Sequence, residues 1–321
     1  MHRSCLIALA WIGLTLACSE PVPPRFDAVE PLPPPAADEG FQVSIHASAA
    51  PGQEIWKCEV IPFLPGEGEE LFSFVNRVQS RQNAGVHHAD LMTLFYTGLQ
   101  IEPGQYDCAD LYAEHTELME EGMIVYGAQL ADATIQLPAG VAAAVPRDSA
   151  YMLEVHYVNA SLEPVDVATY INAYTMPSDQ VVDTIAGDAN RDFDIAVPAG
   201  AVDHVEWTRC VFTADVDLLF LSSHTHARAK NFEIRTFDGE STGDVIYQND
   251  DWHSPQIFAL EEPLRVAAGT GFEYSCLYDN DSDTEVNWGF LAEDEMCQFA
   301  YVFTPGDSSI KCETVASSSD L

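Results

Sequence analysis

Short strand-like segments follow one another along nearly the whole chain, and this pattern constrains the fold most. The segments are rich in β-branched and aromatic residues and are separated by Gly, Pro, Asn and Asp. Long amphipathic helical periodicity is nearly absent. Clear examples are YMLEVHYVN (151–159), VATYINAYTM (167–176), VDLLFLSSHTH (216–226), NFEIRTF (231–237) and FAYVFTP (299–305). The pattern predicts an all-β protein of the sandwich type.

The length of 321 residues suggests two domains of ordinary size, and an apolar content of 47% is enough to build their cores. The polar segment PSDQVVDTIAGDANRDF (177–193) is the best boundary between two halves of similar size. We therefore expect an N-terminal domain over residues 41–178 and a C-terminal domain over residues 179–321.

The first forty residues have the features of an export signal followed by a tether. MHR supplies positive charge, and CLIALAWIGLTLA is an apolar run that is too short to span a bilayer but typical of a signal peptide. Cys18 follows a small residue, as in bacterial lipoprotein signals, although Thr15 and Leu16 are swapped relative to the usual order. The prediction is a signal peptide over 1–17 and a Pro-rich tether over 18–40.

Processing at Cys18 would give an exported lipoprotein, periplasmic or on the cell surface, that is attached to the outer membrane only through its lipid anchor. A plain secreted protein with an unpaired Cys18 is the alternative. The chain has 13 basic and 51 acidic residues, which gives a formal charge of −38. That charge excludes nucleic acid as a partner, because phosphates would be repelled.

Six cysteines remain in the body of the chain, and none forms a CxxC pair, which argues against a thiolate zinc site. An even number in an exported protein favours three disulfides. Six cysteines allow fifteen pairings, and their spacing alone does not choose among them.

The histidines are few and unevenly placed. His224 and His226 stand one residue apart in a predicted strand, so both side chains point the same way and could bind one metal ion. A pair of surface histidines on a strand edge is the alternative. His87 and His88 are adjacent and would face opposite ways unless a bulge intervenes, which the preceding Asn-Ala-Gly could supply.

Two further side chains are ambiguous when they are taken singly. His156 has apolar neighbours on both sides, and a lone histidine of that kind is more often a satisfied core residue. Met296 stands beside Cys297, where a methionine usually fills space in the core. Imidazoles together with a thioether nevertheless favour copper, especially Cu(I), whereas zinc has little use for methionine.

Five motifs, taken in order, resemble the copper type II, ascorbate-dependent monooxygenases. The resemblance covers residues 41–310 and implies two tandem antiparallel jelly-roll β-sandwich domains, with one copper on each domain facing a solvent-filled cleft. The motifs are HHADLMTLFYTG (87–98), YMLEVHYVN (151–159), SSHTHARAK (222–230), YSCLYDN (274–280) and DEMC (294–297).

The same resemblance implies a ligand set, a disulfide pattern and a reaction. The electron-transfer copper would be held by His87, His88 and His156. The catalytic, oxygen-side copper would be held by His224, His226 and Met296. The implied disulfides are Cys58–Cys108, Cys210–Cys312 and Cys276–Cys297. With ascorbate or a similar reductant as co-substrate, O2 would hydroxylate a C–H bond of a small-molecule substrate.

The chain departs from the peptide-amidating members of the family at the substrate position. Ser222 stands where they have an arginine, and Gln298 and Ala300 replace an asparagine and a tyrosine. The carboxylate anchor is therefore missing, and we expect a neutral or cationic substrate. A non-catalytic copper-binding or copper-buffering surface lipoprotein is the alternative function. The sequence gives no indication of the oligomeric state.

Overall fold

The structure is a computed structural model that describes residues 29–62, 71–95, 97–118, 122–147, 149–253, 255 and 257–320. The predicted signal peptide and Cys18 lie outside these residues. None of the described helices is long and apolar enough to cross a membrane. The end of the predicted tether packs on the protein, because Leu32 is buried against Ala168 and Tyr170.

The first half of the chain forms a sandwich of two sheets around one apolar core. One sheet has the order β1 (Gly40–Ala49), β10 (Val165–Thr175), β3 (Phe72–Gln82) and β8 (Val141–Pro146), with β7 (Asp132–Gln136) also paired to β3. The facing sheet has the order β5 (Gly104–Asp107), β2 (Glu54–Ile61), β9 (Tyr151–Val158), β4 (Val86–Thr93) and β6 (Met123–Ala128). Helix α1 (Cys108–Glu114) follows β5 directly.

The second half forms another sandwich with its own core. One sheet has the order β11 (Asp183–Arg191), β20 (Cys297–Thr304), β14 (Val216–Thr225) and β17 (Phe258–Val266). The other has the order β16 (Thr242–Asn249), β15 (Ala229–Phe237), β18 (Gly271–Tyr278), β13 (His204–Phe212) and β21 (Cys312–Ser317). The remaining elements are β12 (Ala196–Val197) paired with β19 (Val286–Asn287), η1 (Ser178–Gln180) and η2 (Ser318–Asp320). The predicted all-β sandwich class is confirmed.

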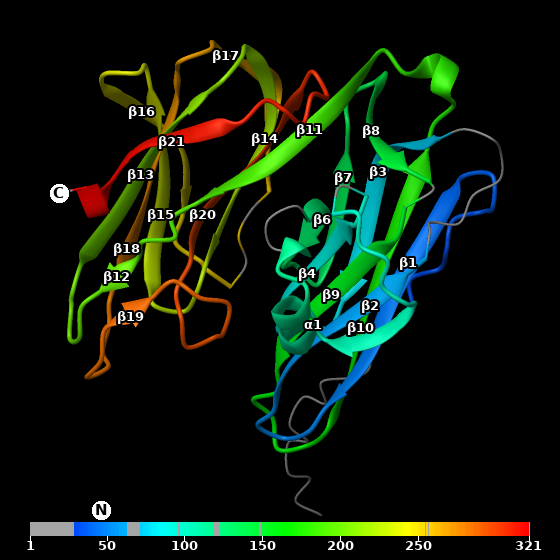
Figure 1. Cartoon of the computed structure of the whole chain (residues 1–321), viewed down its shortest axis with the longest axis horizontal. Helices are drawn as coiled ribbons and strands as arrows, with labels where there is room; N and C mark the ends of the chain where they lie inside the picture. Colours follow the sequence, from blue (N-terminus) through cyan, green and yellow to red (C-terminus); the bar gives the residue numbers. More distant parts are fainter. Residues whose placement is uncertain are drawn as a thin grey trace, which may run out of the picture.

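Strand β11 joins the two sandwiches, which lie side by side in Figure 1. Its first residues pair in parallel with β8, from Asp183↔Val141, and its later residues pair antiparallel with β20, up to Arg191↔Gln298. One nine-stranded sheet therefore runs through both halves of the molecule. The polar segment 177–193 is thus mostly strand rather than linker, with every residue of β11 half-buried.

A buried asparagine closes the same kind of corner in each sandwich. Asn159 and Asn280 each donate from Nδ2 to three backbone carbonyls, and the side-chain oxygen of each accepts the N–H of the serine two residues later. The carbonyls belong to Ala49, Ala50 and Glu163 in the first sandwich and to Val197, Pro198 and Thr284 in the second. The two halves therefore share a local architecture at this corner.

All three implied disulfides are present, joining Cys58–Cys108, Cys210–Cys312 and Cys276–Cys297. Cys297 begins β20 and pairs with Thr225 at the end of β14, so the third bridge lies beside the strand that carries His224.

Candidate metal centre

A β-bulge brings both histidines of β4 to the same partner. The pairing of β4 with β9 shifts between Val86↔Tyr157 and His88↔His156, so His87 is an extra residue in the ladder. The preceding turn contains Gly85 at φ 90, a conformation that favours glycine. The ring centroids of His87 and His88 lie 5.1 and 5.3 Å from that of His156. The bulge that His87 and His88 would need in order to face one metal is therefore present.

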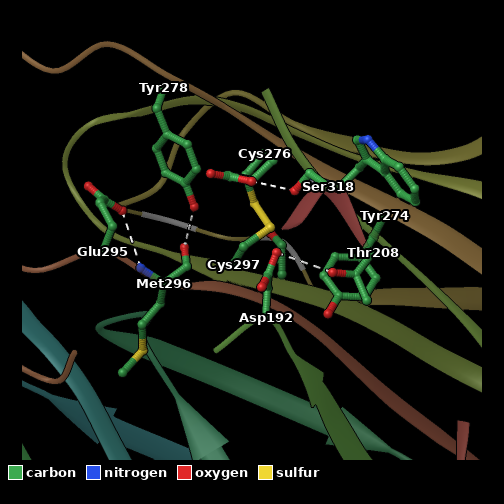
Figure 2. Close-up of a disulfide and its surroundings, with 12 residues drawn as sticks. Asp192, Thr208, Tyr274, Cys276, Tyr278, Glu295, Met296, Cys297 and Ser318 are labelled. Carbon is green, nitrogen blue, oxygen red and sulfur yellow. Dashed lines mark hydrogen bonds between the residues drawn. A yellow bond between two sulfur atoms is a disulfide. The ribbon is translucent and has the colours of Figure 1, made fainter. Parts of the chain in front are cut away.

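Strands β14 and β20 present the second set of candidate ligands. His224 pairs with Gln298, and Thr225 with Cys297; His226 directly follows the end of β14, and Met296 directly precedes the start of β20. His224 and His226 share one face, with ring centroids 5.4 Å apart. The Gln298 amide donates to Met296 Sδ at 2.7 Å. The Met296 side chain points away from the Cys276–Cys297 disulfide (Figure 2).

The two sets of histidines meet. The ring centroid of His87 lies 4.7 Å from that of His226 and 5.3 Å from that of His224, and the His88 and His224 centroids are 5.8 Å apart. Ligand atoms of His87, His88 and His156 all lie within 4.8 Å of one another, and the same holds for His87, His224 and His226. The family resemblance implied two sites across a solvent-filled cleft, but the structure gathers all five imidazoles in one cluster.

The histidines of this cluster are held in the neutral form that a metal requires. Burial, followed by the charge of neighbouring histidines, lowers the pKa of His87, His88 and His224 far below the usual value. Burial also lowers the pKa of His226, to about 4. Burial lowers the pKa of His156 too, although Glu54 opposes that shift. Near neutral pH every ring therefore keeps a nitrogen lone pair.

Three ring nitrogens in this cluster have no hydrogen-bond partner among the described residues. These atoms, Nε2 of His87, His88 and His226, are all buried. His88 Nε2 lies 3.5 Å from a Glu154 oxygen, but the geometry is not that of a hydrogen bond. Leaving such an atom unpaired costs about 1–3 kcal/mol, which a bound metal ion would offset. Neutral imidazoles and a thioether fit copper, especially Cu(I).

Oxygen acceptors around the cluster orient three of the five rings. Because each acceptor is an oxygen, the ring nitrogen beside it carries the hydrogen, and the other nitrogen is left as a ligand atom. The pairs are His156 Nε2 with Glu54 Oε1 at 2.6 Å, His224 Nδ1 with Gln129 Oε1 at 3.0 Å and His226 Nδ1 with the Asp294 carbonyl at 3.0 Å.

Two carboxyl groups, one buried and one half-buried, lie beside the cluster and were not anticipated from the sequence. Asp90 pairs directly with Glu154 across β4 and β9. Burial raises the pKa of Asp90 to about 7, against the opposing charge of Arg191, and burial together with the Asp90 charge raises that of Glu154 to about 8. Both stand two residues from a candidate ligand, so strand alternation could have revealed them. No comparable pattern in the sequence marked Glu54 or Gln129 as neighbours of the ligands.

Glu295 fixes the backbone around the second set of ligands. Its carboxylate accepts N–H groups from His226 at 3.1 Å, Arg228 at 2.8 Å and Met296 at 3.3 Å. The Tyr278 hydroxyl donates to the Met296 carbonyl at 2.8 Å, and Figure 2 shows both contacts to the Met296 backbone. The spacing between His226 and Met296 is therefore set by hydrogen bonds at both backbone ends of the methionine.

Residues 201–320 match the family model described as "Copper type II ascorbate-dependent monooxygenase, C-terminal domain". Over these residues the resemblance to the copper type II ascorbate-dependent monooxygenases is confirmed. The match to this family begins just before β13 and includes His224, His226 and Met296. It does not extend to His87, His88 and His156, so the first ligand set rests on its own geometry.

Comparison with solved structures includes the major capsid protein P2 from bacteriophage PM2, which is 9% identical with a TM-score of 0.30. That alignment covers 82% of this chain and 97% of the capsid protein. A similarity at this level carries no argument about function. No curated protein matched the chain.

Proposed function

We propose that this protein is an exported copper-dependent monooxygenase that hydroxylates a substrate C–H bond with O2 and a one-electron reductant such as ascorbate. The observation that carries the proposal is the convergence of five neutral imidazoles, three of them buried and two half-buried, with an unpaired nitrogen in three of the rings. The family match over residues 201–320 supports the same class.

In this proposal His87, His88 and His156 hold the electron-transfer copper of a domain spanning residues 41–178. His224, His226 and Met296 hold the oxygen-side copper of a domain spanning residues 179–321. Copper supplies oxygen activation and one-electron transfer, chemistry that protein side chains lack. The chain supplies ligand orientation through Glu54, Gln129 and the Asp294 carbonyl, and its burial of the cluster limits access of water.

The strand surface next to His224 lacks the arginine and tyrosine that would bind a substrate carboxylate. Ser222 pairs with Ala300 two residues along the ladder from His224 and Gln298, and neither side chain carries a charge. Arg191 of β11 is in register with Gln298 of β20, and its positive charge interacts with the carboxyl group of the half-buried Asp90. A small neutral or cationic substrate therefore fits this face better than an anionic one.

The proposed export agrees with the disulfides. Three disulfides indicate an oxidising compartment. A lipid on Cys18 would tether the protein to the outer membrane. Mass analysis of the mature N-terminus tests this part, and a chain cleaved elsewhere with Cys18 unmodified would leave a plain secreted protein.

The test of the function is oxygen consumption by the copper-loaded protein with ascorbate. A monooxygenase couples that consumption to a product heavier by one oxygen atom when neutral and cationic C–H compounds are screened, and His224→Ala abolishes the coupling. Copper binding without any oxygenated product would instead identify a copper-buffering protein.

A further inference from the structure

We infer that the free edge of strand β7 is a docking site for an extended peptide segment of a partner protein, which adds to β7 as a further strand. The inference concerns a groove outside the histidine cluster, and it does not rest on the proposed copper function. The groove has a volume of about 410 Å³ and lies where the two sandwiches meet. It is lined by Leu130, the consecutive residues of β7 (Asp132–Gln136), Phe220, Ile257 and Ala259.

The two walls of the groove are built differently. Side chains of a strand point alternately to opposite faces, so a run of consecutive lining residues shows that the groove follows the backbone edge of β7. The opposite wall consists of apolar side chains. They are Phe220 of β14, Ala259 opposite it on β17, and Ile257, two residues before Ala259. One wall therefore offers backbone groups, and the other offers apolar surface.

Hydrogen bonds at both ends of β7 show which of its backbone groups are free. Among the described residues β7 pairs only with β3. The N–H of Gln82 donates to the Ala131 carbonyl, and the N–H of Leu137 donates to the Asn76 carbonyl, at positions that continue the β3–β7 register by one residue at each end. In an antiparallel ladder such hydrogen-bonded pairs alternate with non-bonded ones. The N–H and C=O groups that point away from β3, with no hydrogen-bond partner in the described part of the chain, therefore belong to Asp132, Thr134 and Gln136.

An extended peptide matches both walls. Its backbone pairs with the free groups of β7, as in other complexes that form by strand addition. Every second side chain of the peptide lies on the face of Ile135, which packs in the same apolar cluster as Phe220 and Ile257. Apolar residues are therefore expected at alternate positions. A purely apolar ligand would cover the backbone groups of β7 without pairing them, which is unfavourable.

The charge of the protein indicates the charge of the peptide. Asp132 is the one charged side chain among the described residues that line the groove, and it pairs with Arg81 at 2.7 Å. The formal charge of −38 on the whole chain repels acidic segments and attracts basic ones. The expected partner segment therefore alternates apolar residues, which face the groove, with neutral or basic residues, which face solvent.

Amide hydrogen exchange of the folded protein, followed by NMR with and without peptide, tests the inference. The probes are short capped peptides that alternate Val, Leu or Phe with Lys. Binding should slow exchange of the N–H groups of Asp132, Thr134 and Gln136 by about tenfold or more. No slowing with any probe, or slowing at another edge strand instead, would overturn the inference. Slowing of the same groups that depends on protein concentration without peptide would assign this edge to a second copy of the chain, and would also overturn it.

Two variants examine the backbone wall and the apolar wall separately. Thr134→Pro removes one outward N–H and leaves the ladder to β3 intact, so the protein should fold and bind the probes about five- to tenfold more weakly. Ala259→Asp places a charge in the apolar wall and should weaken binding without any change in β7. Val315→Asp is the matched control and should bind as the wild type, because Val315 is an exposed residue of the edge strand β21. Unchanged affinity in Ala259→Asp, or in folded Thr134→Pro, would show that the peptide binds elsewhere.

Discussion

Asp90 and Glu154 stand directly opposite each other on β4 and β9, on the face that carries His88 and His156, with Glu154 buried and Asp90 half-buried. Like charges placed opposite each other in a sheet are destabilising, and burial adds to that cost. Arg191 supplies one opposing positive charge near Asp90. The pair therefore favours the protonated state over the doubly charged one.

This pair makes the stability of the metal-free protein depend on pH. The folded pKa values, about 7 for Asp90 and about 8 for Glu154, exceed the ordinary values of 3.8 and 4.5. Folding therefore binds protons, and these two groups lower stability progressively as pH rises from about 4 to about 8. Asp90→Asn should raise stability by on the order of 1–3 kcal/mol near pH 8 and by little near pH 4.

Thermal denaturation of the metal-free wild type and Asp90→Asn across this range measures the difference. The histidines of the cluster have lowered pKa values, so they reduce stability as pH falls below about 6.5. Both proteins contain these histidines, so their effect cancels in the difference between wild type and Asp90→Asn. Asp166→Asn on the exposed side of β10 is the control and should show no such trend. A constant difference between wild type and Asp90→Asn at all pH values would contradict the expectation.

Met296 is expected to act as a ligand rather than as filler. It is 2% exposed, so Met296→Ile keeps an apolar side chain of similar volume and should cost less than about 1.5 kcal/mol. The variant should fold and keep copper at His87, His88 and His156, but lose Cu(I) affinity at the second set and nearly all oxygen activation. Met152→Ile, at an equally buried methionine of β9, is the control. Normal Cu(I) affinity and turnover in Met296→Ile would show that Met296 is a core residue and not a copper ligand.

The disulfide next to Met296 should affect one ligand set more than the other. Replacing Cys276 and Cys297 by serine removes the bridge beside the methionine, so copper affinity should fall more at His224, His226 and Met296 than at the first set. The matched control replaces Cys210 and Cys312 by serine. Loss of that bridge should lower the free energy of unfolding by about 2–5 kcal/mol, with less effect on copper affinity. Equal loss of copper in the two double variants would argue against a local role for the Cys276–Cys297 bridge.

Glu295 should control the position of Met296 through the backbone. Glu295→Ala leaves two buried N–H groups and one part-buried N–H group unpaired, a loss on the order of 2–5 kcal/mol of stability. Glu295→Gln keeps one acceptor oxygen and should retain more of both stability and Cu(I) affinity. Calorimetry and Cu(I) competition titrations on both variants give the comparison. Cu(I) affinity that is unchanged in Glu295→Ala would show that the methionine is positioned by other contacts.

The substrate preference follows from the uncharged pair Ser222 and Ala300. Oxygen-dependent mass gain should be greater with small cationic or neutral compounds than with glycine-extended peptides, and raising the ionic strength should weaken the preference for cations. Efficient hydroxylation of a glycine-extended peptide would refute this and would point to Arg191 as an anion-binding group.

The sequence by itself determined the fold class and the candidate ligands, and it showed that His87 and His88 need a bend or a bulge to face one metal. Strand alternation is local, so it put His224 and His226 on one face, and the Asn-Ala-Gly turn before His87 and His88 indicated the bulge that the structure contains. The disulfide pairing did not follow from cysteine spacing and came from the family resemblance, which the structure confirmed.

Only the tertiary structure decided how the two halves meet. Glu54, Gln129 and Phe290 stand far in the sequence from the groups they contact, and no periodic pattern marks them. Segment 177–193 resembles a polar boundary in the sequence because the residues of β11 within it are only half-buried and can be polar, yet β11 pairs with both sandwiches. The approach of His87 to His226 depends on that non-local packing, which the local rules of strand and turn formation do not specify.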